Sequence, residues 1–296
     1  MSRAVARGEA VSWDRAIRTA AARLDAAGID GAARDARLLA AFVAGVDTTA
    51  LRAHGDRVMS EDQQRRLDEA VVARAARRPL SHITGCRLFW GRSFQVSAAV
   101  LDPRPETETL VAEALALCQR ATPGVTLLEL GVGSGCILLT LLAELPAARG
   151  TGTDLSAEAL TVAAANAAAL DLTGRVALVQ GRWFEPVPGK ADILLSNPPY
   201  VPASAWAGLA PEVRDHEPVA ALVPEPDPMG DGLAAYREIL SGARAHLNPG
   251  GAILLEFGAG QGKAVSQIAA DAGFQARRLI PDLDGRERVL IAYSPE

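Results

Sequence analysis

Apolar residues recur at helical spacing through the first part of the chain, from Ser12 to about Ala76. In the first of these segments Trp13, Ile17 and Leu24 fall near one face, and a serine precedes them as a helix cap. Caps and breakers along the region bound four expected helices, at 12–27, 30–45, 49–53 and 60–79. We therefore expect a small all-helical N-terminal domain over residues 1–79.

The pattern changes over residues 80–106, which we expect to link two domains. Within them Gly91 separates two runs rich in aromatic and β-branched residues, as in a β-hairpin. A helix is expected from about Thr107, and strands and helices then alternate. The expected strands are 125–130, 150–154, 176–180, 192–196, 252–257 and 289–293, and the expected helices are 136–145, 156–170, 233–247 and 263–272. This succession predicts a doubly wound, Rossmann-like α/β domain over residues 107–296 with a mostly parallel sheet.

A glycine-rich loop joins the first expected strand of that domain to its helix, in "LLELGVGSGCILLTLL". Glycine lets the backbone turn tightly and approach a ligand. A dinucleotide fingerprint would need Gly or Ala at position 136, where Cys136 stands. The pattern with Glu129 ahead of it instead resembles the S-adenosylmethionine (SAM) site of class I methyltransferases. The candidate cofactor-binding residues are Gly131, Val132, Gly133, Ser134 and Gly135.

Two residues farther along add to this candidate cofactor site. Asp154 ends the second strand, where a carboxylate can accept hydrogen bonds from both hydroxyls of a ribose. Trp183, in "QGRWFEP", follows the third strand and can lie against an adenine ring, with a simple core tryptophan as the alternative. A second glycine cluster, "EFGAGQG", has no later strand ending in an acidic residue, and we interpret it as a turn.

The stretch "SNPPYVP" follows the fourth strand, at the sheet edge where the glycine loop is expected. Methylation of an amide or aromatic amine needs acceptors aimed at its two hydrogens. The side-chain carbonyl of Asn197 and the backbone carbonyl of Pro198 can supply them, since proline fixes the backbone. Tyr200 can stack on the planar target group. We take Asn197, Pro198 and Tyr200 as candidate catalytic residues. The candidate substrate site is formed by Asn197, Pro198, Pro199 and Tyr200, and Asn197 is also a candidate cofactor contact. A plain Pro-Pro loop is the alternative.

Composition narrows the class of protein. The chain has 296 residues, 49% of them hydrophobic and 22% charged, which is typical of a soluble globular protein. A net charge of -5 argues against broad nucleic-acid binding. We find no apolar run of membrane-spanning length and no secretory signal. The three cysteines form no CxxC pair and the four histidines are scattered. We therefore expect a cytoplasmic protein without a metal site.

Seven motifs together resemble the family of release factor glutamine methyltransferases, the protein-(glutamine-N5) methyltransferases. They are "RPLSHITG" (78–85), "FWGRSFQVS" (89–97), "PRPETE" (103–108), "ELGVGSG" (129–135), "SNPPYVP" (196–202), "PEVRDHEP" (211–218) and "GRER" (285–288). The "NPPY" element is shared with DNA adenine and rRNA guanine methyltransferases, whereas "PRPETE" and "PEVRDHEP" are much narrower. The resemblance covers about residues 12–293.

The resemblance implies methyl transfer from SAM, with S-adenosylhomocysteine as the product, to the side-chain N5 of the glutamine in the GGQ motif of class I peptide chain release factors. It implies that the loop 131–135 and Asp154 bind SAM, that Trp183 lies on the adenine side and that Asn197 lies between the methyl group and the substrate. The helical domain would dock the release factor, and we expect a monomer. Arg182 departs from the family, which often has an acidic residue there, and unlike an acidic side chain it cannot accept a hydrogen bond from the adenine amino group.

Other assignments stay open at this point. One is a ribosomal-protein glutamine methyltransferase, and another is a nucleic-acid amino methyltransferase acting on adenine or guanine. A third is a SAM- or dinucleotide-binding module without activity. Three acidic residues of the family-like motifs, Glu106, Glu108 and Glu217, have no clear chemical role, and we expect them to anchor loops.

Overall fold

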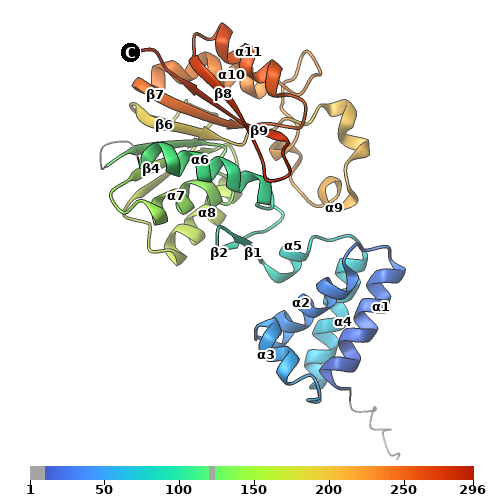
Figure 1. The fold of residues 1–296 in the computed structure, drawn as a ribbon. Helices are drawn as coiled ribbons and strands as arrows, with labels where there is room; N and C mark the ends of the chain where they lie inside the picture. Colours follow the sequence, from blue (N-terminus) through green and yellow to red (C-terminus); the bar gives the residue numbers. More distant parts are fainter. Residues whose placement is uncertain (1–10, 120–123) are drawn as a thin grey trace, which may run out of the picture. The chain divides into compact units, whose positions relative to one another are not determined.

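The computed structural model describes residues 11–119 and 124–296, which form two compact units (Figure 1). The chain passes from the first unit to the second between Gly85 and Cys86. The first unit holds five helices among these residues: α1 (Trp13–Ala26), α2 (Ala32–Ala44), α3 (Thr48–Ala53), α4 (Glu61–Ala75) and α5 (Leu80–Thr84). Helix α5 lies in the segment expected as a linker and packs against α2 and α4.

Local hydrogen bonds explain where the longer helices of this unit begin. The Ser12 side chain accepts from the backbone of Arg15, and Ser60 and Gln63 form a reciprocal capping box at the start of α4. The second helix begins at Ala32 rather than at residue 30, because Gly31 before it has a left-handed φ of 73°.

The second unit opens with a two-stranded hairpin, β1 (Cys86–Phe89) and β2 (Arg92–Gln95). Trp90 and Gly91 form its turn with φ values of 49° and 70°. Two successive positive φ values are typical of the tight turns whose twist matches that of the strands. The hairpin expected around Gly91 is therefore confirmed.

The rest of the second unit is a seven-stranded sheet between helices. Its strands are β3 (Thr126–Leu130), β4 (Arg149–Asp154), β5 (Val176–Gln180), β6 (Ala191–Ser196), β7 (Leu247–Glu256), β8 (Gln275–Pro281) and β9 (Glu287–Tyr293). Its main helices are α6 (Glu108–Cys118), α7 (Cys136–Glu144), α8 (Ala157–Ala169), α9 (Pro211–Arg214), α10 (Ala234–Ala243) and α11 (Gly262–Asp271). The strand order is β5-β4-β3-β6-β7-β9-β8, and β9 runs antiparallel to both of its neighbours.

The second unit differs from the sequence-based expectation in one strand and one helix. Strand β8 was not expected, because residues such as Arg277 and Arg278 lie exposed at the sheet's edge and give no apolar alternation. The helix expected over 233–247 ends at Ala243 and continues as a 3₁₀ turn, Arg244–His246. Leu247 then already begins β7.

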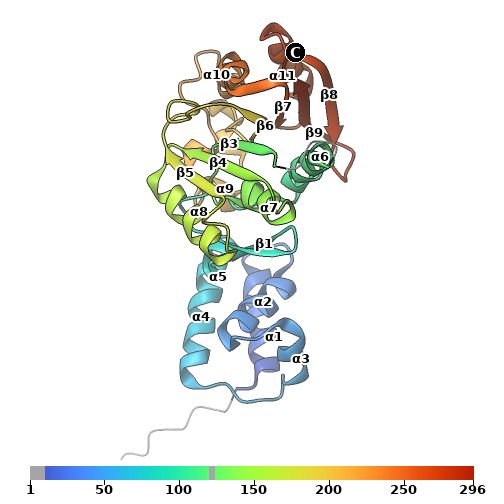
Figure 2. The ribbon, with the colours of Figure 1, turned by 90° about the vertical axis from the view of Figure 1, so that its left-hand side faces the viewer.

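Alternate residues of each central strand enter two different cores. Leu127 packs with α6, α7 and α8 on one face, whereas Leu128 packs with α10 and α11 on the other. Figure 2 shows these two helical layers on opposite sides of the sheet. The sheet is thus buried on both faces, as expected for a doubly wound domain.

The strand order reverses between β3 and β6. From β3 the chain proceeds to β4 and β5 on one side, and it later continues through β6 and β7 on the other. Leu130, the last residue of β3, pairs with Thr153 on one side and Ser196 on the other. Such a reversal leaves a crevice at the carboxyl ends of the strands, where ligands of this fold class bind.

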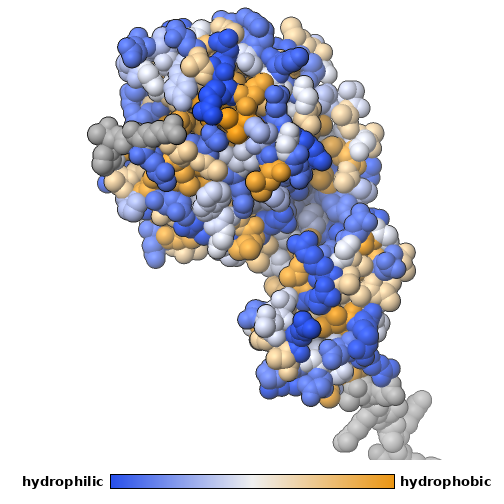
Figure 3. Space-filling view, in the orientation of Figure 1, coloured by the Kyte–Doolittle hydropathy of each residue, from blue (hydrophilic) through white to orange (hydrophobic). Residues whose placement is uncertain are grey.

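Hydrophilic and hydrophobic residues are mixed over the face of the molecule seen in Figure 3. In residues 11–119 and 124–296, none of the helices has both the length and the apolar character needed to cross a membrane.

Candidate active site

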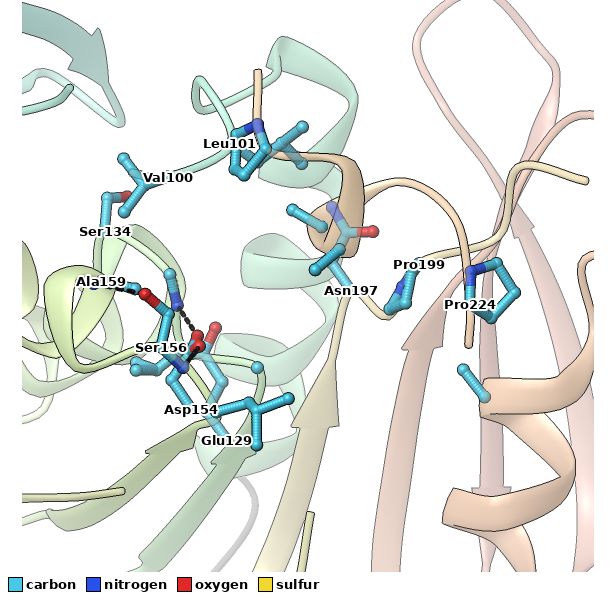
Figure 4. Close-up of a pocket in the computed structure, with 18 of the residues that line it drawn as sticks. Val100, Leu101, Glu129, Ser134, Asp154, Ser156, Ala159, Asn197, Pro199 and Pro224 are labelled. Carbon is cyan, nitrogen blue, oxygen red and sulfur yellow. Dashed lines mark hydrogen bonds between the residues drawn. The ribbon is translucent and has the colours of Figure 1, made fainter. Parts of the chain in front are cut away.

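A cavity of about 730 Å³ opens at the carboxyl ends of β3, β4 and β6. In Figure 4, Glu129 and Asp154 lie on one side of it and Asn197 and Pro199 on the other. The expected site residues that line it are Gly131, Val132, Gly133, Ser134, Asp154, Trp183, Asn197 and Pro199. Its volume lies in the usual range for small-molecule sites. One cavity therefore brings together the glycine loop and the Asn-Pro-Pro-Tyr segment.

The glycine loop turns at residues with positive φ. Gly131 and Gly133 have φ values of 70° and 53°, and the N–H groups of Gly131 and Val132 donate to the carbonyl of Thr153. Gly135 does not line the cavity. Gly135 has a left-handed φ of 80° at the start of α7, and a Cβ there would lie 2.8 Å from Cδ1 of Leu139, so both backbone conformation and packing favour glycine at this position. Its proposed contact with a cofactor stays a prediction.

The Asp154 carboxylate is held by backbone N–H groups. Its Oδ2 accepts from Gly133 and its Oδ1 from Ser156, each over 2.9 Å. Each carboxylate oxygen has a further lone pair, so the side chain can still accept hydrogen bonds from a ligand. The expected carboxylate thus lies in the cavity wall and also fixes the loop that approaches the ligand.

Glu129 holds the beginning of α7. Its side chain is 1% exposed, and its Oε2 accepts from the backbone N–H of Leu138 over 2.9 Å. Burial raises the pKa of this carboxyl well above its usual range, against the opposing effect of that hydrogen bond. Gly135 occupies the N-cap position of α7 and has no side chain that could cap the helix. Glu129 supplies the missing acceptor instead.

Asn166, which the sequence did not single out, ties the loop to the hairpin. Its Nδ2 donates to the carbonyls of Ser134 and Gln95, and its Oδ1 accepts from the N–H of Gln95. The residue is 1% exposed within an alanine-rich helix. A lone amide among alanines was the available signal, and it positions Ser134 at the cavity.

Trp183 lies in the cavity wall beside the first glycine. Its Cζ3 atom would be 3.9 Å from a Cβ on Gly131, and its ring packs partly against the core under α10. Trp183 has a positive φ of 44°, and its carbonyl accepts from the Thr153 hydroxyl. A flat apolar surface therefore stands next to the glycine loop.

The neighbouring Arg182 is paired with an acid. Its Nε and Nη2 donate to the two carboxylate oxygens of Glu238 over 2.8 and 2.6 Å. Both side chains line the cavity. Arg182 cannot accept a hydrogen bond, but its partner places a carboxylate at this end of the cavity. Sequence reasoning missed Glu238, because it lies on α10, far along the chain.

The Asn-Pro-Pro-Tyr segment begins beside the end of β3. Ser196 donates to the carbonyl of Leu130 over 2.7 Å. The next residue, Asn197, faces the cavity, and its Nδ2 donates to Oγ1 of Thr107 over 3.4 Å. Pro198 is buried and does not line the cavity.

Tyr200 also lies outside the cavity wall, packed against two apolar clusters. Burial and nearby Glu256 raise the pKa of its hydroxyl to about 12, so it is neutral at physiological pH.

Gln261 links this segment to the second glycine cluster. Its Nε2 donates to the carbonyl of Tyr200 over 3.1 Å, and its Oε1 accepts from the N–H of Gly258 over 2.9 Å. A Cβ on Gly258 would lie 3.0 Å from the Tyr200 ring. The cluster forms a turn, as expected, and this turn braces Tyr200.

Two of the three acidic residues of the family-like motifs, Glu108 and Glu217, make structural contacts. Oε1 of Glu108 accepts from the N–H of Trp90 in the hairpin turn. Arg104 donates to both carboxylate oxygens of Glu217, each over 2.7 Å, which joins "PRPETE" to "PEVRDHEP". Burial raises the pKa of Glu217 to about 7 and outweighs the effect of Arg104. For Glu106 the structure gives no hydrogen-bond partner within the described ranges.

These residues fit SAM. The cavity offers a backbone that a ligand can approach closely at its glycines, a carboxylate with free acceptor capacity and a flat aromatic wall. These three features suit the charged methionine portion, the ribose and the adenine ring of SAM. No group of His, Cys, Asp and Glu side chains that could hold a metal ion occurs in the parts of the chain that the structure describes.

Known protein families match both units of the chain. A family model described as "PrmC N-terminal domain" matches residues 15–85, and one described as "Methyltransferase small domain" matches residues 108–210. A Cereibacter sphaeroides protein named release factor glutamine methyltransferase is 52% identical over 280 residues, 95% of this chain and 98% of that protein. A Caulobacter vibrioides protein of the same name is 44% identical and covers 91% of this chain and 92% of its own length.

Among solved structures, a methyltransferase from Pyrococcus furiosus superposes with a TM-score of 0.51 at 19% identity. The match covers 80% of this chain and all of that one, and it supports the fold alone.

Proposed function

Because the chain belongs to the release factor glutamine methyltransferase family, we propose that it transfers a methyl group from SAM to the side-chain N5 of the glutamine in the GGQ motif of class I peptide chain release factors. The observation that carries the proposal is the pairing of Leu130 with Ser196. This pairing brings the glycine loop and Asn197 to one cavity, so that a cofactor site and a site for a planar NH2 group adjoin.

The cofactor side of the proposal rests on the wall formed by β3 and β4. SAM supplies a methyl group on a positively charged sulfur, which is already activated for transfer. The backbone of Gly131–Ser134 would approach it, Asp154 would accept from its ribose hydroxyls and Trp183 would lie against its adenine. The Glu238 carboxylate would stand at the adenine end in place of the acidic residue that Arg182 replaces.

The substrate side rests on Asn197 and its neighbours. An amide nitrogen is a poor nucleophile because its lone pair is delocalised. Oδ1 of Asn197 and the backbone carbonyl of Pro198 would accept the two N–H groups of the target and favour a tetrahedral nitrogen. Holding the nitrogen at the methyl group then supplies most of the rate, and the proton leaves afterwards. Pro199, which lines the cavity, would complete the grip, and Tyr200, which lies outside the cavity wall, would support the segment through its packing.

The partner of the enzyme would be the release factor itself, docked with help from the N-terminal helical unit. We place the reaction in the cytoplasm and take the enzyme to act as a monomer without nucleic acid. The buried free thiols of Cys118 and Cys136 support a reducing compartment.

The proposal is tested by transfer of a labelled methyl group from SAM to a purified class I release factor. A release factor with GGQ changed to GGA is the matched control, and a ribosomal protein and RNA are alternative acceptors. Labelling of the wild-type factor alone supports the proposal. Equal labelling of the GGA variant, or labelling of an alternative acceptor instead, contradicts it.

A further inference from the structure

The loop 227–232, which the proposed mechanism does not use, lies directly against the Asn-Pro-Pro-Tyr segment. It has the sequence "DPMGDG" and precedes α10. A Cβ built on Gly232 would lie 2.4 Å from the backbone carbonyl oxygen of Tyr200 and 3.0 Å from both N and Cδ of Pro202. A backbone oxygen cannot rotate away as the end of a flexible side chain can, so only glycine permits this approach.

Contacts of the loop itself hold Gly232 in place. Gly232 has a left-handed φ of 74°, and its N–H donates to Oδ2 of Asp227 over 2.8 Å. The carbonyl of Asp227 accepts from the N–H of Gly230 over 3.1 Å. Leu233, which follows the loop, is 7% exposed and packs in the core under α10. The loop is therefore closed at its start and anchored at its end, and it presents the backbone of Gly232 to Tyr200.

The peptide group between Tyr200 and Val201 is held from two further directions. The carbonyl of Tyr200 accepts from Nε2 of Gln261 over 3.1 Å, and the N–H of Val201 donates to the carbonyl of Leu222 over 2.8 Å. Both polar groups of this peptide are thus satisfied by segments other than its own. Together with Gly232, three separate parts of the chain fix where the Asn-Pro-Pro-Tyr segment ends.

The position of Tyr200 determines the position of Asn197, because two prolines lie between them. The rings of Pro198 and Pro199 fix their own φ angles and restrict the residue that precedes each of them. The other end of this stiff segment is fixed as well, since the Ser196 hydroxyl donates to the last residue of β3 over 2.7 Å. A displacement at Tyr200 therefore cannot be absorbed within the segment, and it moves the groups that face the substrate.

We propose that Gly232 is a positioning residue for methyl transfer. Because it has no side chain, the loop 227–232 can hold the Tyr200 carbonyl where the side chain of Asn197 and the carbonyl of Pro198 are directed at the target NH2 group. Gly232 does not line the cavity, so it acts through this segment and not on a ligand. The inference rests on the proposed function and adds to it the element that sets the geometry of the substrate side.

Two glycines of the loop allow the contact to be separated from backbone strain. Gly230 has a φ of 66°, close to that of Gly232, but nothing lies within 4 Å of a Cβ built on it. Gly230→Ala therefore introduces similar strain without a new contact, whereas Gly232→Ala also places a methyl group against Tyr200. Asp227→Ala is a milder variant, which removes the hydrogen bond that holds Gly232 and adds no atom to the contact.

We expect Gly232→Ala to lower kcat/KM for the release factor about tenfold or more and Asp227→Ala to lower it several-fold, with Kd for SAM within about threefold of wild type. Gly230→Ala should match wild type within about threefold. The loss caused by Gly232→Ala should be much smaller in the Asn197→Ala background, where the side-chain acceptor that the loop directs is absent. An equal loss in Gly230→Ala, or the same fold-loss with and without Asn197, would overturn the inference.

Hydrogen exchange tests the contact without a substrate. The N–H of Val201 should exchange about tenfold faster in Gly232→Ala than in wild type or Gly230→Ala, because its hydrogen bond to Leu222 depends on where this peptide lies. The amides of β3 report global unfolding and should be unchanged. If wild type transfers no methyl group, the proposed function fails, while these exchange rates still decide whether Gly232 holds the peptide. Identical exchange of Val201 in Gly232→Ala and wild type would contradict the inference.

Discussion

The Ser196 hydroxyl donates a hydrogen bond of 2.7 Å to the backbone carbonyl of Leu130. This bond joins the ends of β6 and β3, the two strands between which the strand order reverses. Gly131 and Asn197 follow these two residues, and both line the same cavity. The close approach of the cofactor and substrate sides thus follows from the pairing of two strands.

Asp154 should be essential for binding SAM rather than for chemistry. Asp154→Asn replaces an acceptor with an NH2 group that faces the N–H of Gly133 or Ser156. We expect Kd for SAM to rise about 10- to 100-fold, with kcat at saturating SAM within about tenfold of wild type. Calorimetry and steady-state rates check this, with the exposed Asp271→Asn as control. Unchanged Kd would show that the carboxylate does not contact the cofactor.

Asn197 should act mainly on the rate. Asn197→Ala removes an acceptor at the target nitrogen but leaves the glycine loop and Asp154 in place. We expect kcat to fall about 100- to 1000-fold while Kd for SAM stays within about threefold, as found when a preorganised polar group is removed from other active sites. Single-turnover rates and thermal melting test this together. A parallel loss of folding would point to a structural role instead.

Gln261 should support the substrate side through Tyr200. Gln261→Ala removes the hydrogen bonds to the carbonyl of Tyr200 and the N–H of Gly258, and we expect it to lower stability by about 1 kcal/mol and to raise KM for the release factor several-fold. Gln261→Glu keeps the acceptor and loses the donor, so it isolates the bond to Tyr200. Equal KM values in all three proteins would exclude the brace.

Glu256 should make stability depend on pH. Burial raises its pKa to about 7 from a usual value of 4.5, so the folded protein binds this proton more tightly than the unfolded chain. The stabilising contribution is complete below the unfolded pKa and is lost as the pH rises through the folded pKa. Compared with Glu256→Gln, wild type should lose about 1–3 kcal/mol of unfolding free energy between about pH 4.5 and 7. Urea unfolding at several pH values measures this, and parallel curves would contradict it.

Local patterns in the sequence were sufficient for most of the fold. Serine caps at positions 12 and 60 marked helix starts, and the alternation of strands and helices predicted the parallel part of the sheet. Strand β8 was missed because its exposed edge position leaves Arg277 and Arg278 in contact with solvent, so no buried face appears in the pattern. Residue propensity and periodicity reveal a strand through its buried residues, and β8 has no fully buried residue.

The candidate site was predictable where its residues follow strands. Residues 131–134 of the glycine loop, Trp183 and Asn197 each follow a strand, and Asp154 ends one, at the same edge of the sheet; all of them line the cavity. Contacts between distant segments were not predictable. Thr107 forms a hydrogen bond with Asn197, 90 residues away in the sequence. Glu238 on α10 pairs with Arg182 at the cavity. Only the packed chain brings these pairs together.

The most direct test is to locate the transferred methyl group within the release factor. After reaction with SAM, fragmentation of the GGQ-containing peptide by mass spectrometry should place one added methyl group on the glutamine side chain with wild-type enzyme, and almost none with Asn197→Ala. A methyl group on any other residue, or equal methylation by both enzymes, would contradict the assignment of Asn197 and its neighbours as the site of glutamine N5 methylation.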